Sequence, residues 1–302
     1  MSTILDKISF DCASFIGREL GNVTIIKELG RGNRGVVFIG FQKSLRRQVA
    51  VKILPKASTT TEEDRRRFQD EAEILAVLSH PNIIPIFEMG EEKEFYFQIM
   101  QLINGSDLNN IIKKRLLHPV QSKKILPLDQ TIDIVVQVLD GLGYAHDEGV
   151  IHQDVKPANI LIEERTKRPL IADFGIAKTQ QIAGSSPIDV IIGSPVYISP
   201  EQASADATDN RTDIYSVGIM LLKMLVGTVP RRREKVAQIL LRKIREPDTF
   251  FTMLPSEASP LIDGEMEKII LKAVATDCEK RYKDCYMFRD DLIKYRQRRL
   301  SR

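Results

Sequence analysis

The dominant pattern of apolar residues changes from strand-like to helical near residue 104, and this change limits the folds open to the chain. Before that point, short runs rich in β-branched and aromatic residues alternate with glycine and charged turns, as in antiparallel strands. One stretch, residues 61–78, has helical spacing instead and ends before His80 and Pro81. The sequence therefore predicts a small strand-rich lobe with one helix over about residues 20–100. The expected strands are VTIIKELG, GVVFIGF, QVAVKIL, NIIPIFEMG and EFYFQIM.

From Asp107 onward, helical spacing dominates. The stretch DQTIDIVVQVLDGLGYAH carries an apolar face, and Asp129 at its start is expected to cap the helix. MEKIILKAV and MFRDDLIKYRQRRL, near the end, are further amphipathic helices. Strands followed by helices are typical of α+β folds. The sequence therefore predicts an α+β protein in which a small antiparallel-sheet lobe with one helix is followed by a larger, mainly helical lobe.

Charge and cysteine content argue against several classes of protein. The 302 residues include 44 basic and 41 acidic side chains, so the net charge of +3 gives little attraction to nucleic acid. Three cysteines are too few for a disulfide framework, which favours a reducing compartment. Asp6, Lys7 and Asp11 interrupt any signal peptide, and the apolar run 215–227 is too short to span a membrane. We expect a cytoplasmic protein with no nucleic-acid partner and no membrane span.

Gly30, Gly32 and Gly35 form a GxGxxG pattern between two expected strands. Glycines let a backbone approach phosphate oxygens without a Cβ in the way, but the pattern alone is weak. A dinucleotide fold places it between a strand and a helix, so a hairpin over a nucleotide fits better. Lys52 follows in an apolar strand, where a buried ammonium requires an anionic partner. Glu71 on the expected helix is the candidate partner, with an ordinary structural ion pair as the alternative.

Asp154, Lys156 and Asn159 lie together in VIHQDVKPANI, where Pro157 keeps the preceding helix from continuing. Farther on, Asp173 closes a short apolar strand in LIADFGIAK. Mg²⁺ prefers oxygen ligands and usually takes one or two from the protein, with substrate phosphates completing its shell. Asn159 and Asp173 can supply those oxygens, which leaves Asp154 to accept a hydroxyl proton.

Taken in order, the glycine loop, VAVK, a helix glutamate, an HxDxKxxN loop and DFG resemble a eukaryotic-type (Hanks-type) protein kinase across nearly the whole chain. SPE at 199–201 stands for the family's APE, DIYSVG from Asp213 resembles the buried central helix of its large lobe, and Arg281 matches the arginine that pairs with the APE glutamate. DVKPANIL and GSPVYISPEQ look most like bacterial serine/threonine members. The resemblance implies a bilobal kinase domain at 23–302, with lobes at about 23–103 and 104–302, after an extension at 1–22.

The resemblance also implies a reaction, in which the γ-phosphate of Mg-ATP moves to serine or threonine hydroxyls of protein substrates. Asp154 would be the catalytic base, Lys156 would contact the transferred phosphate, and Asn159 and Asp173 would bind Mg²⁺. The implied ATP contacts are Gly30, Gly32 and Gly35 over the phosphates, Lys52 paired with Glu71, Met100 as gatekeeper, Gln101 to Ile103 as hinge, and Val37, Ala50 and Leu161 around adenine. For each apolar residue, a plain core role is equally compatible.

Gln153 departs from the family, which usually has HRD where this chain has HQD. In the family, the arginine commonly pairs with a phosphorylated residue of the activation loop, a charge-assisted contact that a neutral glutamine cannot make. The glutamine therefore predicts activity that does not require activation-loop phosphorylation. Thr179, Ser185 and Ser186 still offer hydroxyls for self-phosphorylation, and Ser194 can hydrogen-bond the catalytic Asp and Lys.

Two other functions compete with a signalling kinase. Gln153, and Arg34 at the tip of the glycine loop, motivate a pseudokinase that acts as a nucleotide-binding scaffold. Such proteins usually lose the ATP lysine, the base or the DFG aspartate, and this chain keeps all three. A small-molecule phosphotransferase of kinase-like fold is disfavoured by SPE, DIYSVG and Arg281, which belong to the lobe that binds protein substrates.

Overall fold

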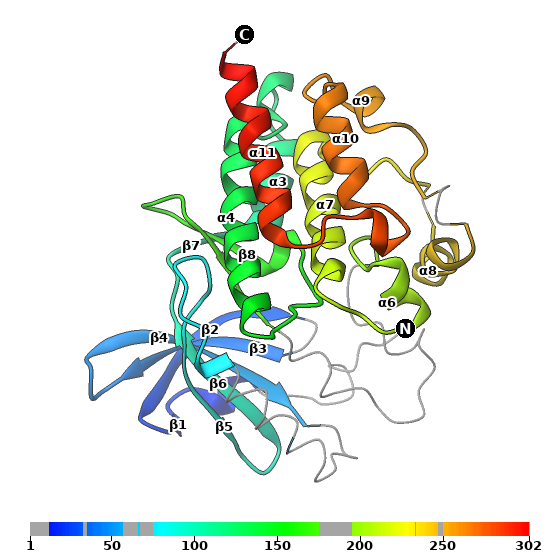
Figure 1. Cartoon of the computed structure of the whole chain (residues 1–302). Helices are drawn as coiled ribbons and strands as arrows, with labels where there is room; N and C mark the ends of the chain where they lie inside the picture. Colours follow the sequence, from blue (N-terminus) through cyan, green and yellow to red (C-terminus); the bar gives the residue numbers. More distant parts are fainter. Residues whose placement is uncertain are drawn as a thin grey trace. The chain divides into compact units, whose positions relative to one another are not determined.

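The computed structural model describes residues 12–32, 35–56, 66, 75–174, 195–232, 234–246 and 250–301. The chain divides into two compact units (Figure 1), Met1–Ser79 with Ile84–Asn104 and His80–Ile83 with Gly105–Arg302. The division after residue 104 coincides with the change from strand to helical spacing in the sequence. Most of the helix expected at 61–78, Glu71 included, lies outside the described residues.

The first unit contains a six-stranded antiparallel sheet with the order β1-β2-β3-β4-β6-β5. All five predicted strands are present, although the fourth begins later than expected, at Ile86, because His80 to Ile83 belong to the other unit. The two-residue strand β1 (Glu19–Leu20) was not predicted, because it is too short to show alternation of apolar and polar residues. The strands are β1 (Glu19–Leu20), β2 (Val23–Gly32), β3 (Gly35–Gln42), β4 (Arg47–Pro55), β5 (Ile86–Glu91) and β6 (Phe95–Gln101), preceded by the 3₁₀ turn η1 (Cys12–Phe15).

One face of this sheet forms the core of the unit. On β4, Val49, Val51 and Ile53 point into a cluster of buried apolar side chains that includes Phe38 and Ile99. Because side chains alternate between the two faces of a strand, the residues between them on β4 point to the opposite face. That opposite face carries the predicted ATP-binding residues described below.

The second unit is mainly helical and contains a small three-stranded sheet, β7-β8-β9. Nearly all side chains of α7 are buried, and α7 contacts both α4 and α10 (Figure 1), as expected for the central helix. The elements are β7 (Gly105–Asp107), α3 (Leu108–Leu116), η2 (Gln121–Lys123), α4 (Leu128–Asp147), η3 (Pro157–Asn159), β8 (Ile160–Glu163), β9 (Pro169–Ile171), α6 (Pro200–Ser204), α7 (Arg211–Val226), α8 (Val236–Arg245), α9 (Pro255–Ala258), α10 (Gly264–Ala273), η5 (Cys278–Lys280) and α11 (Cys285–Leu300).

Helix α4 begins two residues earlier than the sequence suggested. Pro127 occupies the N-cap position, so the prediction that Asp129 caps this helix is wrong. Asp129 lies in the first turn, where its negative charge interacts favourably with the positive end of the helix dipole. The helix is also buried more widely than one face, because Ile134 and Val138 are buried together with Ile132 and Leu139.

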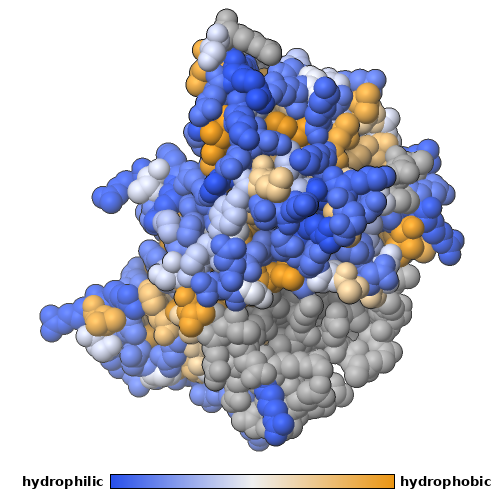
Figure 2. Space-filling view, in the orientation of Figure 1, coloured by the Kyte–Doolittle hydropathy of each residue, from blue (hydrophilic) through white to orange (hydrophobic). Residues whose placement is uncertain are grey.

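The surface agrees with this packing. On the face shown in Figure 2, the described helices present mostly hydrophilic side chains, with apolar ones in small separate spots. Within the described residues, no helix combines the length and the hydropathy that a membrane crossing requires. An antiparallel sheet in one unit and packed helices in the other confirm the predicted α+β fold.

Candidate functional site

The predicted ATP-binding residues of the first unit share one face of its sheet. Val37 on β3 lies directly across from Lys52 on β4, and Ala50 lies across from Met100 on β6. Paired residues of neighbouring antiparallel strands point to the same face, which here is the face opposite the apolar core. Lys52 and Ala50 are buried, whereas Val37 and Met100 are half-buried. This face of the sheet therefore carries the buried Lys52 side chain next to three apolar side chains, those of Val37, Ala50 and Met100.

The glycine loop is the hairpin between β2 and β3, where Gly32 pairs with Gly35. A Cβ at Gly35 would lie 2.1 Å from the Ile53 carbonyl oxygen, so glycine is needed there to pack the hairpin against β4. Gly30 is exposed, and no described atom lies within 4 Å of the Cβ it would carry. Packing among the described residues therefore explains why position 35 is a glycine. It does not explain why position 30 is one.

The predicted hinge, Gln101 to Ile103, starts at the last residue of β6. The Gln101 amide donates a hydrogen bond of 3.0 Å to the Pro85 carbonyl, and Ile103 is half-buried. Glu71, the predicted partner of Lys52, and Arg34 lie outside the described residues, as do Thr179, Ser185, Ser186 and Ser194.

In the second unit, Asp154, Lys156 and Asn159 form one hydrogen-bonded group. The Lys156 Nζ lies 2.7 and 2.9 Å from the two carboxylate oxygens of Asp154. The Asn159 Nδ2 donates to the Asp154 backbone carbonyl at 2.8 Å and to its Oδ2 at 3.1 Å. The 3₁₀ turn η3, which starts at Pro157, brings Asn159 back toward Asp154. Three residues that the sequence grouped by spacing are therefore in direct contact.

His152 connects this loop to the segment that carries Asp173. Its Nε2 lies 2.9 Å from the Ala172 carbonyl oxygen, an acceptor, so this nitrogen carries the proton, and Nδ1 accepts from the Asp154 amide at 3.2 Å. The Ala172 amide in turn donates to the Asn159 carbonyl at 2.8 Å. Asp173, with a left-handed φ of 63°, follows directly. These hydrogen bonds join the loop that carries Asp154 and Asn159 to the residue before Asp173.

Asp213 supports the loop that carries Asp154, a contact that the sequence reasoning missed. Its carboxylate is fully buried and accepts from the backbone amides of His152 at 2.8 Å and Gln153 at 2.7 Å. Gln153 has a φ of 63°, which is unfavourable for a residue other than glycine and costs of order 1–3 kcal/mol. The buried carboxylate stabilises that turn and so fixes the residue before Asp154.

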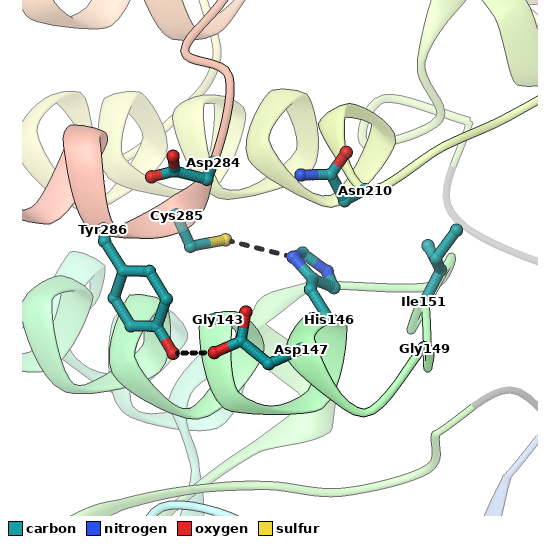
Figure 3. A pocket seen from close by; sticks show the side chains of 9 residues that line it. All are labelled: Gly143, His146, Asp147, Gly149, Ile151, Asn210, Asp284, Cys285 and Tyr286. Carbon is teal, nitrogen blue, oxygen red and sulfur yellow. Dashed lines mark hydrogen bonds between the residues drawn. The ribbon is translucent and has the colours of Figure 1, made fainter.

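A pocket of about 320 Å³ lies behind this turn, between the end of α4 and the start of α11. In Figure 3, His146 faces Cys285, with its Nδ1 3.6 Å from the sulfur, and Tyr286 donates to Asp147 at 2.8 Å. The other ring nitrogen of His146 lies 2.8 Å from Asp213. His146, in the wall of the pocket, therefore contacts the same carboxylate that accepts from the His152 and Gln153 amides.

The side chain and the carbonyl of Gln153 both bind neutral partners. Its Nε2 donates to the Thr208 hydroxyl at 3.3 Å, and its carbonyl accepts from Gln202 Nε2 at 2.9 Å. Gln202 also completes the capping box of α6 with Ser199. Two uncharged hydrogen bonds thereby tie the loop to α6, through Gln202, and to the segment after α6, through Thr208.

Arg281 and Glu201 form the ion pair that the resemblance implied. Two hydrogen bonds of 2.6 and 2.8 Å join them, and the Arg281 side chain is fully buried. Burial by itself would raise the pKa of the Glu201 carboxyl, but the hydrogen bonds and charge of Arg281 hold this pKa below its usual value. The pair anchors α6 to the segment before α11.

We expect Glu201→Gln to lower the free energy of unfolding at neutral pH by about 3–5 kcal/mol, because Arg281 would stay buried without a counter-charge. Since folding lowers the pKa of Glu201, the stability it contributes is present above its unfolded pKa, near 4.5, and is lost as the pH falls through the folded value. Urea unfolding should therefore show the variant approaching the native chain below about pH 4.5. Glu279→Gln is the control and should cost less than about 1 kcal/mol, because the Glu279 side chain is 75% exposed in its pair with Arg211. Equal losses in both variants would rule out the buried pair as the cause.

The residues predicted to bind Mg²⁺ suit that ion. The amide nitrogen of Asn159 is used toward Asp154, which turns its carbonyl oxygen to other partners, and Asp173 supplies a carboxylate. Within the described residues, no group of three or more His, Cys, Asp or Glu side chains could hold a metal. Two protein oxygens completed by phosphates and water are the arrangement that Mg²⁺ favours.

Leu161, a predicted adenine contact, is half-buried on β8 and pairs with Asp107 and Leu170 in the small sheet.

A strand-rich unit with a glycine hairpin, followed by a helical unit carrying an Asp-Lys-Asn loop beside a second Asp, defines the class of proteins with the kinase fold. A model described as the protein kinase domain matches residues 23–292, and the chain belongs to that family. It is 32% identical over 269 residues to serine/threonine-protein kinase PrkC of Bacillus subtilis and 32% identical over 283 residues to serine/threonine-protein kinase PknB of Mycobacterium leprae.

These matches cover 88% and 91% of this chain but only 39% and 42% of the relatives, so the chain spans about two fifths of their length. The crystal structure of the Mycobacterium tuberculosis PknI kinase domain is similar, with a TM-score of 0.73 and 26% identity. That comparison covers 92% of this chain and 98% of the other.

Proposed function

We propose that this chain is an ATP-dependent serine/threonine protein kinase, which transfers the γ-phosphate of Mg-ATP to protein hydroxyls. The observation that carries this proposal is the contact of Lys156 and Asn159 with the carboxylate of Asp154. A carboxylate held in this way can take the proton of a hydroxyl, while the adjacent ammonium stabilises negative charge on the phosphate that the hydroxyl attacks.

The remaining residues supply position. Asn159 and Asp173 would hold Mg²⁺, which when bound neutralises charge on the phosphates. Lys52 would bind the α- and β-phosphates, and the open space at Gly30 suits close approach of a phosphate group. Val37, Ala50 and Met100 would contact adenine from the shared face of the sheet. Orientation and charge stabilisation of this kind supply most of the rate in phosphoryl transfer.

Serine and threonine are the proposed acceptors. Lys156 stands where tyrosine kinases usually carry a different sequence, and two relatives at 32% identity are named serine/threonine-protein kinases. Protein substrates and a role in signalling follow from the same family likeness, because the chain also carries the Glu201–Arg281 pair of the substrate-binding lobe.

The proposed kinase does not require phosphorylation of its activation loop. An arginine at position 153, as is usual in the family, would pair with a phosphorylated residue. The Gln153 side chain instead donates to Thr208, and its carbonyl accepts from Gln202. These neutral contacts need no added charge. They support a catalytic loop that is held in place before any modification occurs.

We therefore expect phosphatase-treated protein to phosphorylate a generic acceptor, such as myelin basic protein, at nearly the rate of untreated protein. Gln153→Arg is the matched variant and should become sensitive to the treatment, since its guanidinium can pair with a phosphate. Initial rates with labelled Mg-ATP measure both. A loss of about tenfold or more in the native chain, the size of one hydrogen bond to a charged group, would contradict the proposal.

A further inference from the structure

Positive charge is concentrated on α3 and the loop that follows it, and the proposed mechanism does not use this charge. The stretch from Leu108 to Leu128 contains five lysine and arginine side chains and no aspartate or glutamate. Their charge exceeds the net charge of +3 of the whole chain, so the remainder of the protein is slightly acidic. Together these five residues are the basic surface: Lys113, Lys114, Arg115, Lys123 and Lys124.

Arg115 brings the two parts of the basic surface together. Its Nη1 donates to the carbonyls of Lys123 and Ile125, each at 3.2 Å, so the loop folds back onto the last turn of α3. Within the loop, the His118 ring accepts from the Val120 amide at 3.0 Å, and the Lys123 amide donates to the Val120 carbonyl at 3.0 Å. The basic side chains are therefore held on an ordered piece of backbone, which lowers the entropy lost when a partner binds.

No carboxylate within the described residues neutralises the basic surface. None of its members forms an ion pair there, and the guanidinium of Arg115 binds backbone carbonyls instead. Burial lowers the pKa of Lys223 on α7, and the charge of Lys113 acts in the same direction, so a further cation lies close by. Like charges that gather without a counter-charge repel one another, and an anionic partner relieves that repulsion.

The helix dipole accounts for only part of this pattern. Lys113, Lys114 and Arg115 lie in the last turn of α3, where a positive charge is favourable. Lys123 and Lys124 lie beyond that helix, so its dipole does not explain them. A purely solvated charge run does not explain the apolar side chains that accompany it either.

Two of those apolar side chains project from the loop. Leu117 is 85% exposed and Val120 is 48% exposed, whereas Leu116 and Ile125 lie against Gly227 at the end of α7. Single exposed apolar residues are ordinary on protein surfaces, but these two stand in the chain between the two groups of basic residues. A partner that covers them and supplies negative charge gains from both contacts.

We propose that the basic surface, together with Leu117 and Val120, is a docking site for an acidic segment of the protein substrate that also carries apolar residues. This inference rests on the proposed kinase function. A peptide is favoured over an anionic membrane, because two separate apolar side chains bury too little area for insertion. It is favoured over a nucleic acid, because contacts to phosphates need no exposed leucine.

The first test measures binding of the fluorescent peptide EELEEVEE by anisotropy. Native protein should bind it at least about tenfold more tightly than the uncharged QQLQQVQQ, and added NaCl should weaken the binding. Leu117→Ser should weaken it about twofold or more, because the leucine is then not available to bury. The main variant should weaken it about tenfold or more, and it keeps Arg115, which holds the loop. That variant combines Lys113→Gln, Lys114→Gln, Lys123→Gln and Lys124→Gln.

The control variant removes the same amount of charge from exposed lysines elsewhere in the same unit and should bind the peptide as native protein does. It combines Lys268→Gln, Lys280→Gln, Lys283→Gln and Lys294→Gln. Equal weakening in the two variants, or binding that does not depend on Leu117, would overturn the proposed site. Tighter binding of native protein to vesicles of phosphatidylserine and phosphatidylcholine, or to single-stranded oligouridylate, than to the peptide would overturn it as well.

The second test joins EELEEVEE to a serine acceptor peptide through a glycine-serine linker of about 30 residues, whose r.m.s. span is about 30 Å. We expect a KM about fivefold or more below that of the same acceptor joined to QQLQQVQQ, with kcat within about twofold, because docking holds substrate and transition state equally. The main variant should lose this advantage. Equal KM values for the two peptides with native protein would overturn docking. Native protein that binds EELEEVEE but transfers no phosphate would instead refute the proposed kinase function.

Discussion

Asp154→Asn is expected to lower the rate of phosphotransfer by at least about 10²- to 10⁴-fold, the range typical of acid-base groups. Asparagine has the same shape and can still accept from Asn159, but its amide cannot take the proton of the attacking hydroxyl. Its amide also faces Lys156, which lies 2.7 Å from the carboxylate, without the attraction of a negative charge. The fold and the nucleotide affinity should change little, since Asp154 belongs to a loop that other residues hold.

Initial rates with labelled Mg-ATP and a generic protein acceptor measure the effect, and calorimetric titration with a nonhydrolysable ATP analogue measures binding. Asp147→Asn is the control, because Asp147 bonds Tyr286 away from the catalytic loop and should keep normal turnover. Undiminished transfer by Asp154→Asn would remove Asp154 as the base. Native protein that binds nucleotide but transfers nothing would favour the scaffold alternative.

The residues of the candidate site could be proposed from the sequence because each lies in a short motif of fixed spacing. The strands could be predicted as readily, since one face of the sheet is apolar. Alternation along β4 places the Lys52 side chain on the other face of the sheet from that of Val51. Asp154 and Asn159 are only five positions apart, and the 3₁₀ turn that starts at Pro157 brings them into contact. Short separations along the chain make such geometry almost a local property.

Contacts between distant segments could not be read in this way. Asp213 is separated from His152 by 61 positions, and its own neighbourhood only shows a buried helix. Lys243 is buried and donates to the Val196 and Ile198 carbonyls. It did leave a signal that was not used, since Val236, Ile239 and Leu240 place it on the apolar stripe of α8. A charged residue on such a stripe must find buried partners. Which carbonyls it finds depends on how α8 packs, and the sequence does not contain that information locally.

The second large effect is expected from Asp213→Asn, which replaces no residue of the proposed phosphotransfer machinery itself. The carboxylate now accepts from the amides of His152 and Gln153 and lies 2.8 Å from His146 Nε2. Asparagine offers one oxygen and one NH₂ group, so at least one buried donor would face another donor at a cost of about 1–3 kcal/mol.

Because Gln153 is held at a left-handed φ by this carboxylate, its loss should let the turn relax and shift Asp154. A displacement of about 1 Å at a reacting group can cost about 10²-fold in rate, so kcat should fall by about that factor while the KM for ATP stays nearly constant. Asn210→Ala, which removes only an exposed bond from the same end of α7 to the Lys283 carbonyl, should keep kcat within about twofold. Rates taken well below the unfolding temperature of each variant separate misplacement from loss of fold. A normal kcat for Asp213→Asn would mean that the catalytic loop keeps its geometry without the buried carboxylate, and that the strain at Gln153 is borne by its contacts with Thr208 and Gln202 instead.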